Sequence, residues 1–281
     1  MKLSKHIILV STVIALGVLC SANFKKQKTQ ELTEVINSSN SAGPLPDRKN
    51  TAFKEGEVLT YRMHYGIINA GAAILEVKPD ILTVNGRSVY HIVGTGYTTG
   101  TADWFFKVRD RYETYMDKDA LLPWLFVRRV DEGGYKFQQD YKFNHYTKKV
   151  DVGNDQKFDI PMGIQDMVSA FYSVRSLDLS NAKTGDIFSL DCFLDKEIWP
   201  LKIKFMGKEI IETDIGKFRC LKFRPIVQKG RVFKKEEDLN VWISDDNNHI
   251  VMRAKADVLI GSVKMDITSV KNLTNSMSRV N

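Results

Sequence analysis

Apolar and polar side chains alternate along most of the chain beyond residue 53. In residues 135–144, YKFQQDYKFN, the aromatic side chains fall on one face of an extended strand, and the other face carries lysine, glutamine and aspartate. Successive side chains of a strand point to opposite faces, so this pattern indicates a sheet with one face in water. It recurs in residues 61–67, 72–77, 89–97, 108–116, 124–130, 188–194, 201–206, 218–223, 239–243, 250–258 and 260–267.

The connections between these segments favour antiparallel pairing. Gly133-Gly134 separates two alternating segments, as in a tight hairpin. Parallel pairing would require helical crossovers, which are mostly missing from the sequence. We therefore predict a mainly β fold built as a large curved antiparallel sheet or half-barrel, with two successive sheets as the alternative.

One segment, residues 164–177, has helical spacing instead. Met167, Phe171 and Val174 recur every three or four positions and share one face. Asp166 lies where a side chain can cap free backbone N–H groups. We expect the apolar stripe to pack on the concave face of the sheet, and the opposite side, including Ser173, Arg175 and Ser176, to face water. The helix is then either a permanent plug, which we favour, or a lid over a ligand groove. A second, shorter helix is expected in residues 99–106.

The first 22 residues have the pattern of a secretory signal peptide. Two lysines precede a 13-residue uncharged run, residues 7–19, which as a helix spans about 20 Å and is too short to cross a bilayer. Cys20 and Ala22 are the small residues expected before a cleavage site. We predict export to the periplasm. The alternatives are an uncleaved anchor and a lipid attached to Cys20, although the preceding Val18 and Leu19 are bulkier than usual in lipoprotein signals.

Composition suggests the remaining boundaries. Residues 23–50 are polar, contain two prolines and read as a flexible linker; residues 51–273 form the antiparallel β domain; residues 274–281 read as a disordered tail.

The charge balance argues against nucleic acid as a partner. The chain has 281 residues with a formal charge of +7, and removal of Lys2 and Lys5 with the signal peptide leaves 39 basic against 34 acidic residues. This small surplus is interleaved with acidic residues along the chain.

Chemical motifs are weak. The glycines of residues 94–100 match no phosphate-binding loop, and no Gly-x-Ser-x-Gly motif is present. We therefore expect no cofactor, metal ion or catalytic residue. Two groups of residues could contradict this expectation. The histidines His64, His91, His145 and His249 could meet in a metal site, and the carboxylates Asp103, Asp110 and Glu113, beside Arg109 and Arg111, could include a catalytic pair. In Arg128-Arg129 one guanidinium points inward and needs a carboxylate partner.

Two cysteines, Cys192 and Cys220, remain after signal cleavage. An oxidising compartment permits a disulfide between them, but the spacing does not specify one. We favour two buried free thiols.

Several short motifs resemble a known family. Residues 207–223 read GKEIIETDIGKFRCLKF: a strand, a Thr-x-x-Gly turn and an alternating strand. Together with DDNNHIVM at 245–252 and GSVKMD at 261–266, this segment resembles the exported bacterial family DUF3108. The likeness covers residues 52–272 and implies an architecture similar to the half-barrels of periplasmic lipoprotein carriers. The family has no established activity, so the resemblance assigns no catalytic residues.

These observations lead to one expectation and one alternative. We expect an exported, non-catalytic cell-envelope protein that binds a lipid or other apolar ligand, or an envelope protein. The alternative is an envelope hydrolase acting on glycan or lipid, with paired carboxylates on the concave face of the sheet.

Overall fold

The structure is a computed structural model that describes residues 44–280 except 81, 85, 227–238 and 258–260. The expected signal peptide, Cys20 and most of the expected linker lie outside the described residues. Within them, no helix is both long and apolar enough to cross a lipid bilayer.

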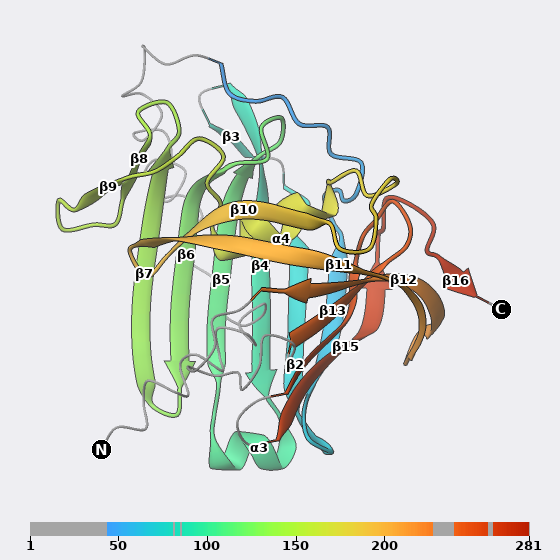
Figure 1. The fold of residues 1–281 in the computed structure, drawn as a ribbon. Coiled ribbons are helices and arrows are strands. Elements are labelled where there is room, and N and C mark those ends of the chain that lie inside the picture. Colours follow the sequence, from blue (N-terminus) through green and yellow to red (C-terminus); the bar gives the residue numbers. More distant parts are fainter. Residues whose placement is uncertain (1–43, 81, 85, 227–238, 258–260, 281) are drawn as a thin grey trace.

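The described chain is mainly β, with two short helices (Figure 1). The strands are β1 (Val58–Tyr65), β2 (Ile68–Val77), β3 (Leu82–Val84), β4 (Arg87–Thr98), β5 (Arg109–Asp117), β6 (Pro123–Glu132), β7 (Tyr135–Asn144), β8 (Lys149–Asp151), β9 (Lys157–Asp159), β10 (Ile187–Leu194), β11 (Glu197–Thr213), β12 (Gly216–Pro225), β13 (Leu239–Ser244), β14 (Val251–Asp257), β15 (Ser262–Lys271) and β16 (Arg279–Val280). The helices are α3 (Gly100–Phe105) and α4 (Met167–Arg175).

All of these strands belong to one antiparallel sheet. Their order is β10-β11-β12-β13-β14-β15-β1-β2-β4-β5-β6-β7-β8-β9, with β3 on β4 and β16 on β12. The pairing of β15 with β1 joins the C-terminal strands to the N-terminal ones, so the alternative of two successive sheets is wrong. The edge strands β9 and β10 do not pair with each other, and the sheet stays open.

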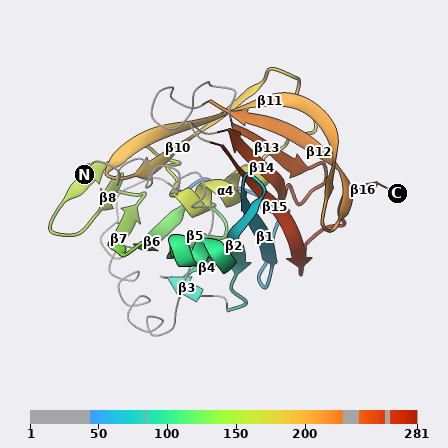
Figure 2. The ribbon, with the colours of Figure 1, turned by 90° about the horizontal axis from the view of Figure 1, so that it is seen from below.

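The sheet curves around α4, which confirms the predicted curved architecture with a helix on the concave face. In Figures 1 and 2, β4–β7 form one wall, β11–β15 form the other, and α4 lies between them. Strand β7 shows the predicted alternation: Tyr141 and Phe143 are buried in the concave face, whereas Lys136 and Gln138 are exposed on the convex face. The second predicted helix is also present, as α3.

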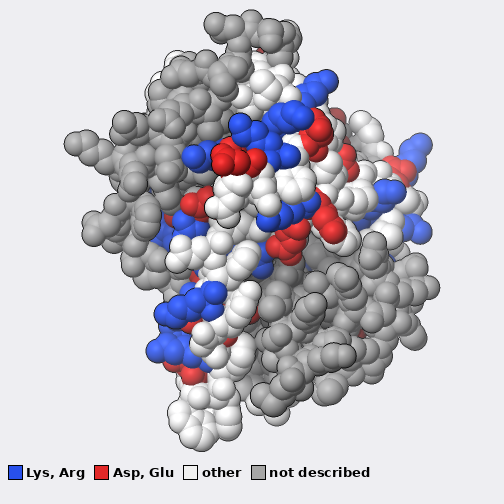
Figure 3. All heavy atoms as spheres, turned by 90° about the vertical axis from the view of Figure 1, so that its left-hand side faces the viewer, with Lys and Arg blue, Asp and Glu red and all other residues white. Residues whose placement is uncertain are grey.

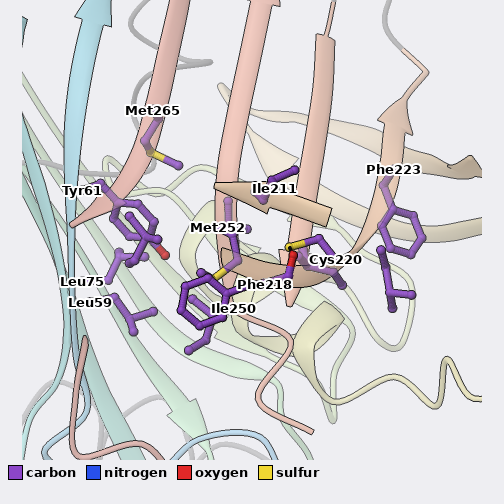
Figure 4. Packing of buried hydrophobic residues seen from close by; sticks show 14 of the residues in the cluster. Leu59, Tyr61, Leu75, Ile211, Phe218, Cys220, Phe223, Ile250, Met252 and Met265 are labelled. Atoms are coloured by element: carbon purple, nitrogen blue, oxygen red, sulfur yellow. Dashed lines mark hydrogen bonds between the residues drawn. The ribbon is translucent and has the colours of Figure 1, made fainter. Parts of the chain in front are cut away.

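Two hydrophobic clusters line the concave face. One covers β4–β7 and contacts α4; its large members include Phe126, Tyr141 and Tyr172. The other lies among β1, β2 and β11–β15, where Leu59 and Tyr61 face Met252 and Phe218 (Figure 4). Phe171 of α4 packs against both clusters.

The C-terminal residues are not a disordered tail. Strand β16 pairs with β12, and Ser278 is buried with its N–H donating to Asp246 at 2.7 Å and its hydroxyl to the Arg219 carbonyl at 2.8 Å. Polar composition suggested disorder, but these polar groups bond to the loop between β13 and β14 and to strand β12. Asn50, at the end of the expected linker, is likewise bonded to the domain through Tyr90 Oη at 2.9 Å.

Candidate functional site

The first turn of α4 is fixed to the sheet by Asp166. Its carboxylate accepts hydrogen bonds from the N–H groups of Val168 and Ser169 at 2.7 and 2.8 Å, and the Ser169 hydroxyl accepts one from the Asp166 N–H. The other carboxylate oxygen accepts the hydroxyl of Thr114 on β5 at 2.6 Å. Asp166 is fully buried, and the lack of water raises its pKa to about 6 despite these bonds. The helix therefore begins at a buried cap on the concave face.

The last turn of α4 is fixed by Arg175. Its guanidinium donates to both carboxylate oxygens of Glu57 at 2.6 and 2.8 Å and to the Asn248 carbonyl at 2.9 Å. The rings of Phe53 and Tyr172 lie against it, at 5.4 and 5.0 Å from the guanidinium carbon. Glu57 is completely buried and Arg175 almost so. One ion pair thus holds the helix, the start of β1 and the β13–β14 loop together.

This arrangement corrects the predicted orientation of α4. Ser173 and Arg175, expected in water, are buried, whereas Met167, Phe171 and Val174 are only half-buried. The apolar spacing indicated the helix correctly but not its deepest face. That face is set by Glu57, whose carboxylate lies 118 positions away in sequence and draws Arg175 inward.

A hairpin passes over the concave face beside α4. It consists of β10 and the first part of β11, residues 187–206, and we call it the strap. Figure 1 shows it crossing in front of β4–β7, and in Figure 2 it arches opposite these strands. Cys192 and Phe188 point inward. Cys192 lies near the buried Asp166 carboxyl, and the centroids of the Phe188 and Phe223 rings are 6.0 Å apart. Residues that alternate or pair with these two share the inner face of the strap. Phe193, near the tip, departs from this alternation, because it is also buried and its ring packs against Tyr141.

The inner face of the strap is apolar and only half-buried. The side chains that share this face and this partial exposure are Phe188, Leu190, Trp199, Leu201 and Ile203. Phe188 and Ile203 pack against the cluster near β11–β15, but none of the three clusters of described residues contains Leu190, Trp199 or Leu201. On β4 of the opposite wall, Gly94 and Gly96 carry no side chain. Both glycines lie within strand β4.

The tip of the strap is fastened to β6 by Arg128. This is the inward arginine of the predicted pair, and its carboxylate partner is Asp195 at 2.9 Å, in the turn between β10 and β11. The guanidinium also lies over the rings of Tyr112 and Phe137, at 5.8 and 5.3 Å. Arg129 points outward and binds Asp140.

Two of the buried acids meet on the concave face below Arg128. Asp110 hydrogen-bonds to Glu132 and to the Asp131 N–H, and burial raises the pKa of Asp110 above its ordinary value. A hydrogen bond between two carboxyl groups requires a proton on one of them and holds them closer than the 5 Å or more that separates the carboxylates of glycoside hydrolases. The other candidate acids lie elsewhere: Asp103 binds Arg109, and Glu113 binds Arg111 and His91.

The histidines do not meet. His91 Nε2 lies 2.6 Å from Glu113, His145 Nε2 lies 2.7 Å from the Pro123 carbonyl and His249 Nδ1 lies 2.8 Å from the Arg175 carbonyl. Burial lowers the pKa of His145 to about 4. The described residues include no group of three or more His, Cys, Asp or Glu side chains that could hold a metal ion.

Cys192 on β10 and Cys220 on β12 are both buried free thiols, and strand β11 separates them in the sheet. Burial raises the pKa of each thiol to about 12, so neither is a reactive thiolate at neutral pH.

These features place the protein among mainly β proteins built from one open, curved antiparallel sheet. Residues 60–268 match the family described as protein of unknown function (DUF3108), and the chain belongs to that family, as its motifs indicated. A search of curated proteins found no match.

Several solved structures are similar to this chain at low sequence identity, and the first of them shares the fold. The crystal structure of a beta-barrel-like protein of domain of unknown function DUF1849 from Brucella abortus is 12% identical, with a TM-score of 0.51 over 78% of this chain and 99% of that one. A candidate lipoprotein from Parabacteroides distasonis is 12% identical, with a TM-score of 0.35 over 80% of this chain and 100% of that one. A candidate exported protein from Bacteroides fragilis is 11% identical, with a TM-score of 0.31 over 83% and 100% of the two chains.

Proposed function

We propose that this is an exported cell-envelope protein that binds an apolar ligand without transforming it, on the concave face between α4 and the strap. The observation that carries the proposal is the half-buried apolar inner face of the strap, from Phe188 to Ile203. Each square ångström of apolar surface left in water costs about 25 cal/mol, so a ligand that covers these side chains gains that free energy on binding. On the opposite wall, Gly94 and Gly96 add no side chain to this part of the concave face.

The fixed position of α4 supports a binding site beside the helix rather than beneath it. The Asp166 cap and the Arg175–Glu57 pair hold both ends of the helix, so a ligand that needed its removal would have to break a buried ion pair. Phe171 and Val174, two of the half-buried helix residues, then contribute to the wall of the ligand site. The helix is a plug for one half of the concave face and a boundary for the other.

A matched pair of variants on the strap tests ligand binding. Leu201 faces inward and Lys202, the next residue, is exposed on the outer face. With a fluorescent fatty-acid analogue as the probe, Leu201→Asp should weaken binding at least about tenfold, because a carboxylate must then be desolvated at the site. Lys202→Asp should bind as the parent does. Failure of the parent to bind the probe, or equal affinity of both variants, would overturn the proposal, and melts of both variants check that each is folded.

Export is supported by the sequence of residues 1–22 and is tested by mass. The intact protein isolated from its own cells should begin near Asn23 and, after denaturation without reductant, should titrate two free thiols, Cys192 and Cys220. A mass that includes residues 1–22, or a diacylglycerol on Cys20, would contradict a cleaved soluble form. The same spectrum under native conditions reports any molecule that is bound.

The hydrolase alternative receives less support. Asp110 and Glu132 do converge on the concave face, but their hydrogen bond leaves no space for a substrate between them. An envelope protein partner is the other reading of the site, and it predicts that the fatty-acid analogue does not bind.

A further inference from the structure

We infer that one end of the sheet docks on the surface of a lipid bilayer. This end consists of α3, the β1–β2 turn and the β6–β7 turn, and we call it the α3 end. The inference goes beyond the proposed function, because docking requires no bound ligand.

The α3 end displays large apolar side chains to solvent. Ile67 is 100% exposed, Trp104 80%, Phe105 73% and Ile68 55%. Isolated exposed apolar residues are ordinary on protein surfaces, but a group of aromatic and aliphatic side chains at one end marks an interaction surface.

Hydrogen bonds between the turns show that these side chains belong to the same end. The Thr99 N–H, just before α3, donates to the Ala70 carbonyl on β2 at 3.2 Å. The Gly133 N–H of the β6–β7 turn donates to the Lys107 carbonyl, just after α3, at 2.7 Å. In Figure 1, α3 forms the lower end of the molecule, and in Figure 2, viewed from below, it is the element in front.

Helix α3 is held by its polar side, which leaves its apolar side chains outward. The Thr98 hydroxyl donates to Asp103 at 2.7 Å, and Arg109 Nη1 donates to Asp103 at 2.6 Å. None of the helix residues from Gly100 to Phe105 is buried. A six-residue helix has little stability of its own in water, so these bonds fix it in an orientation that exposes Trp104 and Phe105.

The shape and chemistry of the α3 end fit a bilayer better than a protein partner. The apolar side chains project from a short helix and from a turn, so they suit a fluid medium that closes around them. Tryptophan is favoured at the level of the lipid headgroups, where its ring meets both apolar and polar surroundings. Exposed Lys107 and Lys136 flank them and suit anionic headgroups, although Lys136 also pairs with Asp131 at 3.3 Å. In Figure 3, the lowest part of this face is uncharged, and Lys and Arg atoms, with some Asp and Glu atoms among them, lie just above it.

Vesicle binding tests the inference. The probes are vesicles of phosphatidylcholine alone and vesicles of phosphatidylcholine with phosphatidylglycerol at about 3:1. The difference in binding between the two measures the contribution of anionic lipid. The parent should sediment with the anionic vesicles, and Trp104→Ser/Phe105→Ser should bind them at least about tenfold more weakly, a difference of about 1.4 kcal/mol. The control, Ile187→Ser, removes an exposed apolar side chain from the outer strap, away from the α3 end, and should bind as the parent does.

A second readout reports on Trp104 itself. Lipids brominated near the headgroup should quench the parent's tryptophan emission, and Trp104→Phe, which keeps an apolar ring, should bind but lose most of that quenching. Because all variants share one N-terminus, differences between them report on the α3 end. Equal vesicle binding by the parent and the double variant would overturn the inference. So would a concentration-dependent dimer abolished by the double variant, since the occupant would then be a second copy. If the parent does not bind vesicles but binds the fatty-acid analogue, the proposed function stands and docking does not. If the parent binds vesicles but not the analogue, docking stands and the proposed function does not.

Discussion

Arg175 and Glu57 form an ion pair from which water is excluded. Removing two charges from water costs several kcal/mol for each ion, and the pair recovers this only because both carboxylate oxygens and three guanidinium nitrogens are hydrogen-bonded. Such a pair contributes less to net stability than to the choice of one arrangement. It joins residue 57 to α4, and so determines which face of the helix is buried.

Breaking this pair should be more harmful than replacing it. Arg175→Met leaves the Glu57 carboxylate buried without its partner and should lower the free energy of unfolding by about 3–5 kcal/mol. Glu57→Leu/Arg175→Met removes both charges and should lose less than Arg175→Met alone. Urea melts of the parent and the two variants measure this, and a double variant as unstable as Arg175→Met would show that the pair itself stabilises the fold.

Asp166 predicts a pH dependence of stability. Its pKa of about 6 in the folded protein lies above the ordinary value of 3.8, so the folded state binds the proton more tightly than the unfolded state. The resulting stabilisation is complete below pH 3.8 and is lost as the pH rises through 6. Asp166→Asn keeps an oxygen acceptor for the helix cap but cannot ionise. It should reduce the change in unfolding free energy between pH 4 and pH 7 by about 2–3 kcal/mol. Identical pH profiles for the variant and the parent would contradict a raised pKa.

At the scale of the element, α4 and the strap bury their faces to different extents. Helix α4 has both ends fixed and Tyr172 completely buried. In the strap, by contrast, the inward positions of β10 and β11 are mostly half-buried and the outward ones mostly exposed. Its tip is held to the opposite wall by Arg128–Asp195 and by contact of the Phe193 ring with Tyr141 at 5.0 Å. The helix is therefore the more firmly packed of the two elements.

Two aromatic substitutions in α4 test whether the helix is a plug. Tyr172→Ala empties a fully buried position and should cost about 3–5 kcal/mol of unfolding free energy. Phe171→Ala should cost less, because its ring is half-buried, but still more than about 1 kcal/mol if the helix is a permanent part of the core. Denaturant melts measure both. A loss below that limit for Phe171→Ala, together with altered uptake of the fatty-acid analogue, would favour a lid.

At the scale of the whole molecule, the two ends of the sheet approach each other without joining. The chain begins its sheet with β1 in the middle of the strand order, so β9 and β10 become the two edges. The strap brings one edge over the other wall. There the Gln165 N–H donates to the Asp191 carbonyl at 2.9 Å and the Phe193 N–H donates to the Gln165 carbonyl at 2.8 Å, and side chains at the tip of the strap add further contacts. Two backbone hydrogen bonds can separate at a smaller cost than a full ladder between two strands.

Release of the strap tip should change the kinetics of ligand exchange. Asp195→Ala removes the carboxylate that binds Arg128, and we expect the fatty-acid analogue to dissociate several times faster, because the strap separates from β6 more often. The control is Asp159→Ala, which removes an exposed carboxylate that binds Lys149 on the neighbouring β8. Stopped-flow displacement of the probe measures the rates. Equal dissociation rates for both variants and the parent would show that the ligand leaves by another route.

The alternation of apolar and polar residues was sufficient to predict the antiparallel sheet, its wet face on β7 and the existence of both helices. These are local properties, because a period of two or of 3.6 residues can be recognised within a short stretch of consecutive residues. The Asp166 cap and the inward direction of one of Arg128 and Arg129 were predictable for the same reason. A helix start and a strand face each depend on a few neighbouring residues.

Tertiary structure alone decided the rest. The pairing of β15 with β1, which makes one sheet from two runs of strands, joins segments about 200 residues apart. The burial of Arg175 depends on Glu57, and the partner of Arg128 depends on the turn of the strap. A sequence period states which side chains share a face but not what that face meets. Contacts between distant segments therefore determined which helix face is buried and which apolar surface stays half-covered.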